Sequence, residues 1–186
     1  MQLHASKNNR TKDNLMNIIK AKTSVDLKLA QIAWVVKDIE AAERFFKDTL
    51  GISGFGKPMT IRAQDFKATY YGKLADAESF VSMAYSGGTF IEIIQPLSGQ
   101  SVFQDYLHKN PAGGLQHIAY SIPVAYFDQV ISEFTDKGYP LIATYDTPIA
   151  QIVFFDTCKE IGIMTELMGI TMEGEEQVEK MKGVAT

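Results

Sequence analysis

The sequence predicts an α+β fold in which paired βαβββ modules form one open, cup-shaped mixed sheet with helices outside. Two observations lead to this prediction. Residues 29–36 and 113–122 have the same design, an apolar strand that carries one polar side chain, Gln31 or His117, at matching places. Each segment precedes the same predicted order of one helix and three strands. One half has too few strands to enclose a hydrophobic core of its own. The two halves are therefore expected to curl into a single sheet with a ligand site between them.

The composition narrows the class of protein. A chain of 186 residues, 46% hydrophobic and 22% charged, suits one globular domain or two halves that share a core. The net charge of −4 argues against a nucleic-acid partner. The single cysteine, Cys158, excludes an intramolecular disulfide framework and a Cys-rich zinc site. With no membrane-length apolar stretch and no apolar signal-peptide core, we expect a cytoplasmic protein without a membrane partner.

The chain divides into three parts by composition. Residues 1–26 are polar and rich in Lys and Asn, and we expect an N-terminal extension that could form a helix. Residues 27–168 carry the two modules, the first over 27–96 and the second over 114–168. Residues 169–186 are charged and helix-prone, which predicts a C-terminal helical tail.

The first module begins with a predicted strand over residues 27–36. Asp38 is a suitable N-cap for a helix over residues 39–50, which Gly51 ends as a C′ glycine. Residues 52–66, rich in Gly and Pro, are expected to form a connecting loop. Three strands are then predicted, at residues 67–74, 80–85 and 89–95.

The second module repeats this order. A short helix over residues 101–109 leads to a strand over residues 115–122. A helix over residues 125–137 follows, and Gly138 ends it. Three more strands are predicted, at residues 140–145, 151–155 and 163–168.

Strand alternation decides which side chains share a face. Gln31 shares its face with Ala33, and His117 shares its face with Ala119. The opposite faces carry bulkier side chains, which suit a packed helix. On the face that carries Gln31 and His117, the small neighbouring side chains leave room for a ligand.

Glu92 and Glu166 each stand alone in an apolar run, on the last strand of their module. A buried, unpaired carboxylate is costly, so each must be exposed, paired or bound to a cation. Taken singly, a strand Glu is more often solvent-facing, and a strand His is more often a hydrogen-bonded core residue. Four such residues at repeat-related positions favour a divalent metal site with the ligands Gln31, Glu92, His117 and Glu166, for Zn²⁺, Ni²⁺, Co²⁺, Mn²⁺ or Mg²⁺.

Four segments carry a resemblance to a known family: residues 31–51, 90–101, 114–119 and 154–167. Together they resemble the vicinal oxygen chelate superfamily, the glyoxalase/bleomycin resistance/dioxygenase-like proteins. Segments 90–101 and 114–119 look most like the methylmalonyl-CoA epimerase-like and glyoxalase I-like branch. The resemblance covers residues 27–168 and is specific for the superfamily rather than for one reaction.

The resemblance implies a site and an activity. The family's metal ligands lie on the first and last strands of each module, which match Gln31, Glu92, His117 and Glu166. Many relatives have His in place of Gln31, although a Gln-Glu-His-Glu set resembles that of some glyoxalase I enzymes. The implied enzyme is a metal-dependent isomerase, epimerase or lactoylglutathione lyase-like protein that abstracts a proton next to a carbonyl. Glu166 is then the expected base, with Glu92 as the second candidate.

The family also implies partners and leaves alternatives open. The implied substrate is an acyl thioester or a glutathione adduct, and the implied assembly is a homodimer. A non-catalytic protein that binds a small molecule on the same fold is the main alternative. An extradiol-type dioxygenase is disfavoured, because two His ligands are needed and the other histidines, His4 and His108, lie in the N-terminal extension and at a helix end.

Overall fold

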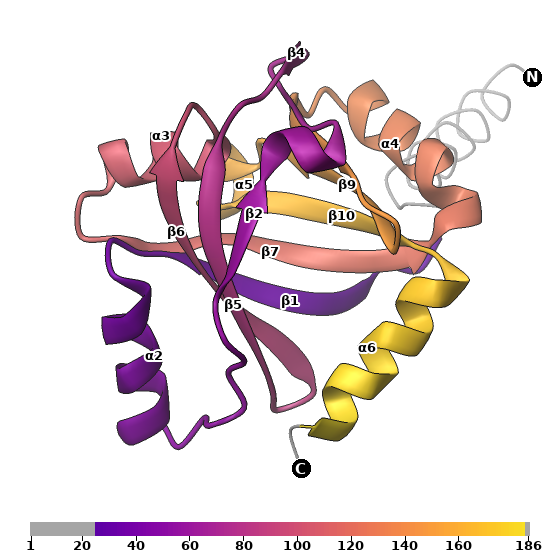
Figure 1. Cartoon of the computed structure of the whole chain (residues 1–186). Helices are drawn as coiled ribbons and strands as arrows, with labels where there is room; N and C mark the ends of the chain where they lie inside the picture. The colour runs from indigo at the N-terminus through magenta and orange to yellow at the C-terminus, as the bar shows by residue number, and fades with distance from the viewer. Residues whose placement is uncertain (1–24, 185–186) are drawn as a thin grey trace, which may run out of the picture.

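The computed structural model describes residues 25–184, and the predicted N-terminal extension lies almost entirely outside them. One sheet of ten strands forms the body of the described residues, in the spatial order β2-β5-β6-β1-β7-β10-β9-β8-β3-β4. Figure 1 shows this sheet curled into a cup, with β1 and β7 side by side across its middle. This architecture confirms the predicted α+β fold with one open, cup-shaped sheet.

The elements have the following bounds. The strands are β1 (Lys28–Val35), β2 (Met59–Arg62), β3 (Thr69–Tyr70), β4 (Lys73–Leu74), β5 (Glu78–Ser86), β6 (Thr89–Ser98), β7 (Gly114–Pro123), β8 (Leu141–Asp146), β9 (Ala150–Phe155) and β10 (Met164–Ile170). The α-helices are α2 (Ile39–Asp48), α3 (Val102–Lys109), α4 (Phe127–Asp136), α5 (Cys158–Ile161) and α6 (Met172–Val184). Two 3₁₀ turns are η1 (Ala63–Phe66) and η2 (Val124–Tyr126).

The two modules join through their first strands. β1 and β7 pair antiparallel, and each also pairs in parallel with the last strand of its own module, β6 or β10. The four strands that carry the candidate ligands therefore lie next to one another in the centre of the sheet. This arrangement follows from the repeat, because each module contributes the same two strands to the junction.

Helices α2 and α4 cover the outer face of the sheet. Asp38 caps α2 as predicted, since its carboxylate accepts a hydrogen bond from the backbone N–H of Ala41 at 2.9 Å. Phe46 of α2 then packs edge-on against Trp34 of β1, with ring centroids 5.4 Å apart. In the second module α4 buries Val130 in the corresponding place. The bulky residues of β1 and β7 thus face helices, and the small ones face the interior.

The bridging segment, residues 63–77, differs from the sequence prediction. The strand predicted over residues 67–74 is a short hairpin of β3 and β4, because Tyr71 and Gly72 both have positive φ and reverse the chain. β3 pairs with β8 of the second module, where the hydroxyls of Thr69 and Thr144 lie 2.8 Å apart. β2 lies within residues 52–66, which were expected to be a loop, and this expectation was wrong.

This segment also draws the two ends of the sheet together. β2 lies at one end of the strand order and β3 near the other, yet only residues 63–68 separate them along the chain. A connection of this length spans a short distance, so the sheet must curl until its ends are close. Buried Ala63, Ala68 and Ala77 pack the bridging segment against Tyr145 of β8.

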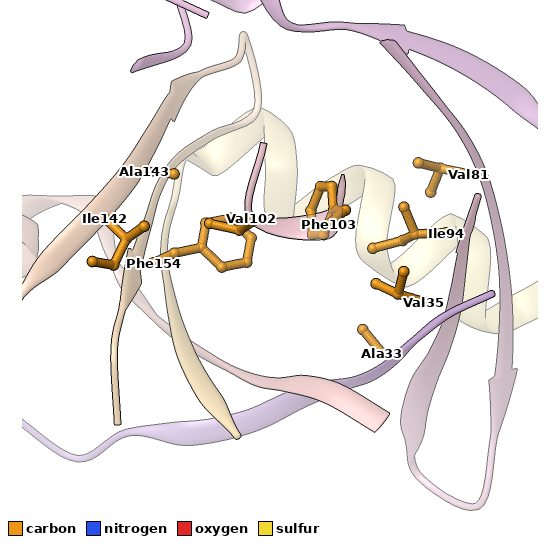
Figure 2. Close-up of a cluster of buried hydrophobic side chains, with 9 residues drawn as sticks. All are labelled: Ala33, Val35, Val81, Ile94, Val102, Phe103, Ile142, Ala143 and Phe154. Carbon is orange, nitrogen blue, oxygen red and sulfur yellow. The ribbon is translucent and has the colours of Figure 1, made fainter. Parts of the chain in front are cut away.

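Helix α3 fills one end of the cup. Its first residues, Val102 and Phe103, are buried among strands of both modules. Figure 2 shows this cluster, in which Val35 and Ile94 approach from one side and Phe154 from the other. The hydroxyl of Tyr70 in the bridging segment donates a 2.6 Å hydrogen bond to Asp105 of α3. The helix between the modules is therefore fixed inside the curl of the sheet.

Helix α6 follows β10 and leads back towards the first module (Figure 1). Gly174 is buried near its start, close to the carbonyl of Ile149. Near its end the Lys182 ammonium lies 5.9 Å from the ring centroid of Tyr85 in β5. The predicted helical tail is thus present within the described residues. None of the helices in this part of the chain has the length and apolar character needed to cross a membrane.

We expect Gly113→Ala to destabilise the fold more than Gly138→Ala. Both glycines have positive φ, but a Cβ at Gly113 would lie 2.6 Å from the carbonyl oxygen of Val35, whereas one at Gly138 would meet nothing within 4 Å. Backbone strain alone should cost about 1 kcal/mol at residue 138, and the added clash should bring the loss at residue 113 to about 3 kcal/mol. Urea unfolding measures the loss in the free energy of unfolding for both variants. Equal losses would show that the close approach of residues 113 and 35 contributes nothing to the difference.

Candidate active site

The four predicted ligand residues meet on the inner face of the sheet. The imidazole Nε2 of His117 lies 2.8 Å from a carboxylate oxygen of Glu166 and 3.6 Å from one of Glu92. The amide nitrogen of Gln31 donates to the same Glu92 oxygen at 2.8 Å and lies 3.3 Å from His117 Nε2. Residues far apart in the sequence therefore form one connected polar cluster, which we call the quartet.

Strand register explains why the quartet assembles. In the central ladders Ala33 lies opposite both Glu92 and His117, and Ala119 lies opposite both Gln31 and Glu166. Residues opposite one another in a ladder project from the same face of the sheet. The two alanines are fully buried and occupy the positions between the four polar side chains. Their small size lets the longer side chains approach one another.

Gln116 contacts the quartet, and the sequence analysis did not single it out. Its side-chain oxygen lies 2.6 Å from Nδ1 of His117, and its amide nitrogen donates to the sulfur of Met164. Strict alternation would place Gln116 and His117 on opposite faces. The ladder between β1 and β7 is irregular here, however, because Ala33 pairs with His117 while Trp34 pairs with Leu115. The extra residue in this β-bulge is Gln116, and the bulge lets its side chain reach the imidazole.

This contact orients the ring of His117. A side-chain carbonyl oxygen accepts hydrogen bonds, so Nδ1 must carry a proton and donate it to Gln116. Nε2 is then the nitrogen that faces the carboxylates. The ring of Phe154 packs edge-on against His117 at 5.1 Å between centroids and limits its rotation.

The electrostatics of the quartet are governed by burial. The side chain of Glu166 is 4% exposed and that of Glu92 is 14% exposed. Burial raises the pKa of Glu92 to about 7, the imidazole of His117 opposes this shift, and the negative charge of Glu166 adds to it. Two carboxylates in so little water repel each other, so the quartet favours a bound positive charge.

Tyr145 is a second residue that the sequence analysis did not identify. Its ring packs against Phe154, which in turn packs against His117. Burial, together with the negative charges of Glu166 and Glu92, raises the pKa of the Tyr145 phenol to about 12. The phenol therefore stays protonated and lies in the field of both carboxylates. No local pattern in the sequence indicates this, because it depends on the pairing of β8 with β9.

A divalent cation is the group that the quartet could hold. Within residues 25–184, no group of three or more His, Cys, Asp or Glu side chains is arranged to hold a metal ion as it stands, and the side chains of the quartet bond to one another. The spacing nevertheless fits: neighbouring ligands at about 2.1 Å around an octahedral ion lie about 3 Å apart, and the atoms that meet in the quartet lie 2.8 to 3.6 Å apart. Turning the Gln31 amide by half a rotation would present its oxygen.

Comparison with known families matches residues 30–155 to the Glyoxalase/Bleomycin resistance protein/Dioxygenase superfamily. This match spans most of the chain, and the protein belongs to this superfamily. The resemblance inferred from the sequence is therefore confirmed.

Curated relatives include epimerases. The chain is 33% identical over 95 residues to an ethylmalonyl-CoA/methylmalonyl-CoA epimerase of Cereibacter sphaeroides, which covers 51% of this chain and 60% of that protein. It is 30% identical over 95 residues to the mitochondrial methylmalonyl-CoA epimerase of Homo sapiens, covering 51% of this chain and 46% of that protein. The chain thus matches about half the length of these relatives.

Solved structures agree on the fold. The methylmalonyl-CoA epimerase of Mycobacterium tuberculosis superposes with a TM-score of 0.55 at 17% identity, covering 81% of this chain and 93% of that one. A methylmalonyl-CoA epimerase in complex with methylmalonyl-CoA and NH4+ gives a TM-score of 0.53 at 21% identity, covering 80% and 95%. At these identities the likeness establishes the architecture.

We predict that His117→Leu lowers the free energy of unfolding of the metal-free protein by about 3 kcal/mol. Removing the partner of a buried charged group leaves that group without compensation. Urea unfolding in the presence of a chelator measures the loss. His108→Leu is the matched control, since His108 is exposed and hydrogen-bonds to Gln104 on its own helix, so its loss should stay within about 0.5 kcal/mol. Similar losses for the two variants would mean that the quartet contributes nothing to stability.

Proposed function

We propose that this protein is a divalent-metal-dependent enzyme that abstracts a proton next to the carbonyl of an acyl thioester, in the manner of an acyl-CoA epimerase. The observation that carries this proposal is the meeting of one buried and one largely buried carboxylate with an oriented imidazole on the inner face of the sheet. The proposed ligands are the Gln31 amide oxygen, the Glu92 and Glu166 carboxylates and His117 Nε2. A bound cation would stabilise negative charge that develops on the substrate oxygen.

The quartet and its neighbours have separate proposed roles. Gln116 holds the imidazole so that Nε2 faces inward. Glu166 is the proposed base, because a carboxylate beside the substrate carbon can accept the proton that the carbonyl acidifies. Glu92 is the second candidate base, and its greater exposure, 14% against 4%, favours contact with a substrate. Phe154 excludes water from the imidazole side of the site.

The substrate class and the assembly rest on the relatives. The curated relatives act on methylmalonyl-CoA or ethylmalonyl-CoA by name, which supports an acyl thioester here. A glyoxalase-like reaction on a glutathione adduct is the alternative within the same chemistry. A protein that only binds an apolar molecule would not need two buried carboxylates, which argues against the non-catalytic alternative. Homodimerisation and a cytoplasmic location stay predictions.

Deuterium uptake from D₂O at the α-carbon of acyl-CoA substrates tests the reaction. We expect Glu166→Gln to lower the exchange rate at least a hundredfold, because a positioned base contributes about that factor. Treatment with a chelator should abolish exchange, and added metal should restore it. Glu40→Gln is the control, since Glu40 is exposed on the outer helix α2. The proposal fails if protein purified without chelator contains no divalent metal and Glu166→Gln exchanges as fast as the native chain.

The orienting role of Gln116 gives a separate prediction. Gln116→Leu removes the acceptor that holds Nδ1 of His117, and losing such a partner typically weakens metal binding about 10- to 100-fold. Calorimetric titration with Ni²⁺ or Zn²⁺ measures this change. Gln104→Leu, on the solvent side of α3, should leave the affinity unchanged. An unaltered affinity in Gln116→Leu would remove Gln116 from the site.

A further inference from the structure

The charge of the quartet limits what else can bind beside it. Glu92 and Glu166 bring two negative charges, which together balance one divalent cation. Gln31 and a neutral His117 add none. A cation held by these residues therefore has no net charge left to attract an anionic group on the substrate.

The described positions next to the quartet on the inner face offer no other positive charge. Met83 lies opposite Glu92 in the ladder, Met164 lies opposite His117, and Phe90 lies opposite Gln31. The next positions along the same face carry Tyr85, Met168 and Ile152, and beyond them Ser121 lies opposite the exposed Lys28 at the start of β1. An anion placed among Met83, Met164 and Phe90, next to the quartet, would lose its water without gaining a partner.

The positive side chains lie elsewhere. Within residues 25–184, every Lys and Arg is exposed except Lys182 of α6, whose side chain is 35% exposed. Lys182 already pairs with Glu179 at 2.6 Å and lies over the ring of Tyr85, at the rim of the inner face. The described residues thus place no buried Lys or Arg against the quartet.

From this arrangement we infer that the reacting end of the substrate is uncharged, so that the enzyme takes a neutral acyl thioester rather than a malonyl-type one. The inference rests on the proposed function, because it concerns the substrate of the same site. It also separates this chain from the relatives whose names specify methylmalonyl-CoA or ethylmalonyl-CoA. A carboxylate on the α-carbon would add a third negative charge beside Glu92 and Glu166, and like charges this close disfavour one another strongly.

A pair of nearly isosteric thioesters tests this directly. Isobutyryl-CoA and methylmalonyl-CoA differ by a methyl in place of the carboxylate on the α-carbon. Calorimetric titration of the Ni²⁺-loaded protein should show isobutyryl-CoA binding at least tenfold more tightly.

A charge variant sharpens the test. Glu92→Gln removes one negative charge while keeping an oxygen ligand, so at saturating Ni²⁺ it should shift the ratio of the two affinities about tenfold towards methylmalonyl-CoA. Glu40→Gln makes the same change on the outer face and should alter neither affinity. Equal or tighter binding of methylmalonyl-CoA by the native protein overturns the inference, and so does a failure of both thioesters to bind.

Deuterium exchange separates this inference from the proposed function. If methylmalonyl-CoA binds more tightly and exchanges its α-proton, the inference is wrong and the proposed function stands. If isobutyryl-CoA binds more tightly but neither thioester exchanges, the charge preference of the site stands and the proposed reaction is wrong.

Discussion

The Nε2 atom of His117 faces two buried carboxylates, with Glu166 at 2.8 Å and Glu92 at 3.6 Å. Much of the inner sheet can be understood from the cost of keeping these groups out of water. Burial raises the pKa of Glu92, and only a positive charge or hydrogen-bond donors can compensate. The amide of Gln31 donates to Glu92 in this structure, and the proposed cation would lie among Glu92, Glu166 and Nε2 of His117. The cluster favours a function that uses a cation.

The surrounding structure holds this cluster in position from several directions. Ala33 and Ala119 keep the ladder positions between the polar side chains small. The β-bulge at Gln116 brings an acceptor to the far side of the imidazole. Phe103 of α3 and Phe154 of β9 pack near the ring. Rigid packing of this kind keeps catalytic groups in place better than loops do.

The bridging segment connects the two ends of the curled sheet. By pairing β3 with β8 it ties the first module to the outer edge of the second. It also carries Tyr70, whose bond to Asp105 fixes α3 inside the curl, and it packs against Tyr145. Tyr145 in turn lies in the field of Glu92 and Glu166. An irregular insertion thereby links the outer edge of the sheet to the quartet.

The sequence by itself determined the repeat, the capped helix after Asp38 and the matching places of Gln31, Glu92, His117 and Glu166 within their strands, because caps and strand alternation are local properties. Only the tertiary structure decided three other features. The bulge at Gln116 breaks alternation through the pairing of β1 with β7, and the partner of β3 is a strand far along the chain. The approach of Tyr145 to the carboxylates depends on the order of β8, β9 and β10. Each of these is a long-range pairing, and periodicity along a strand does not specify which strand lies beside it.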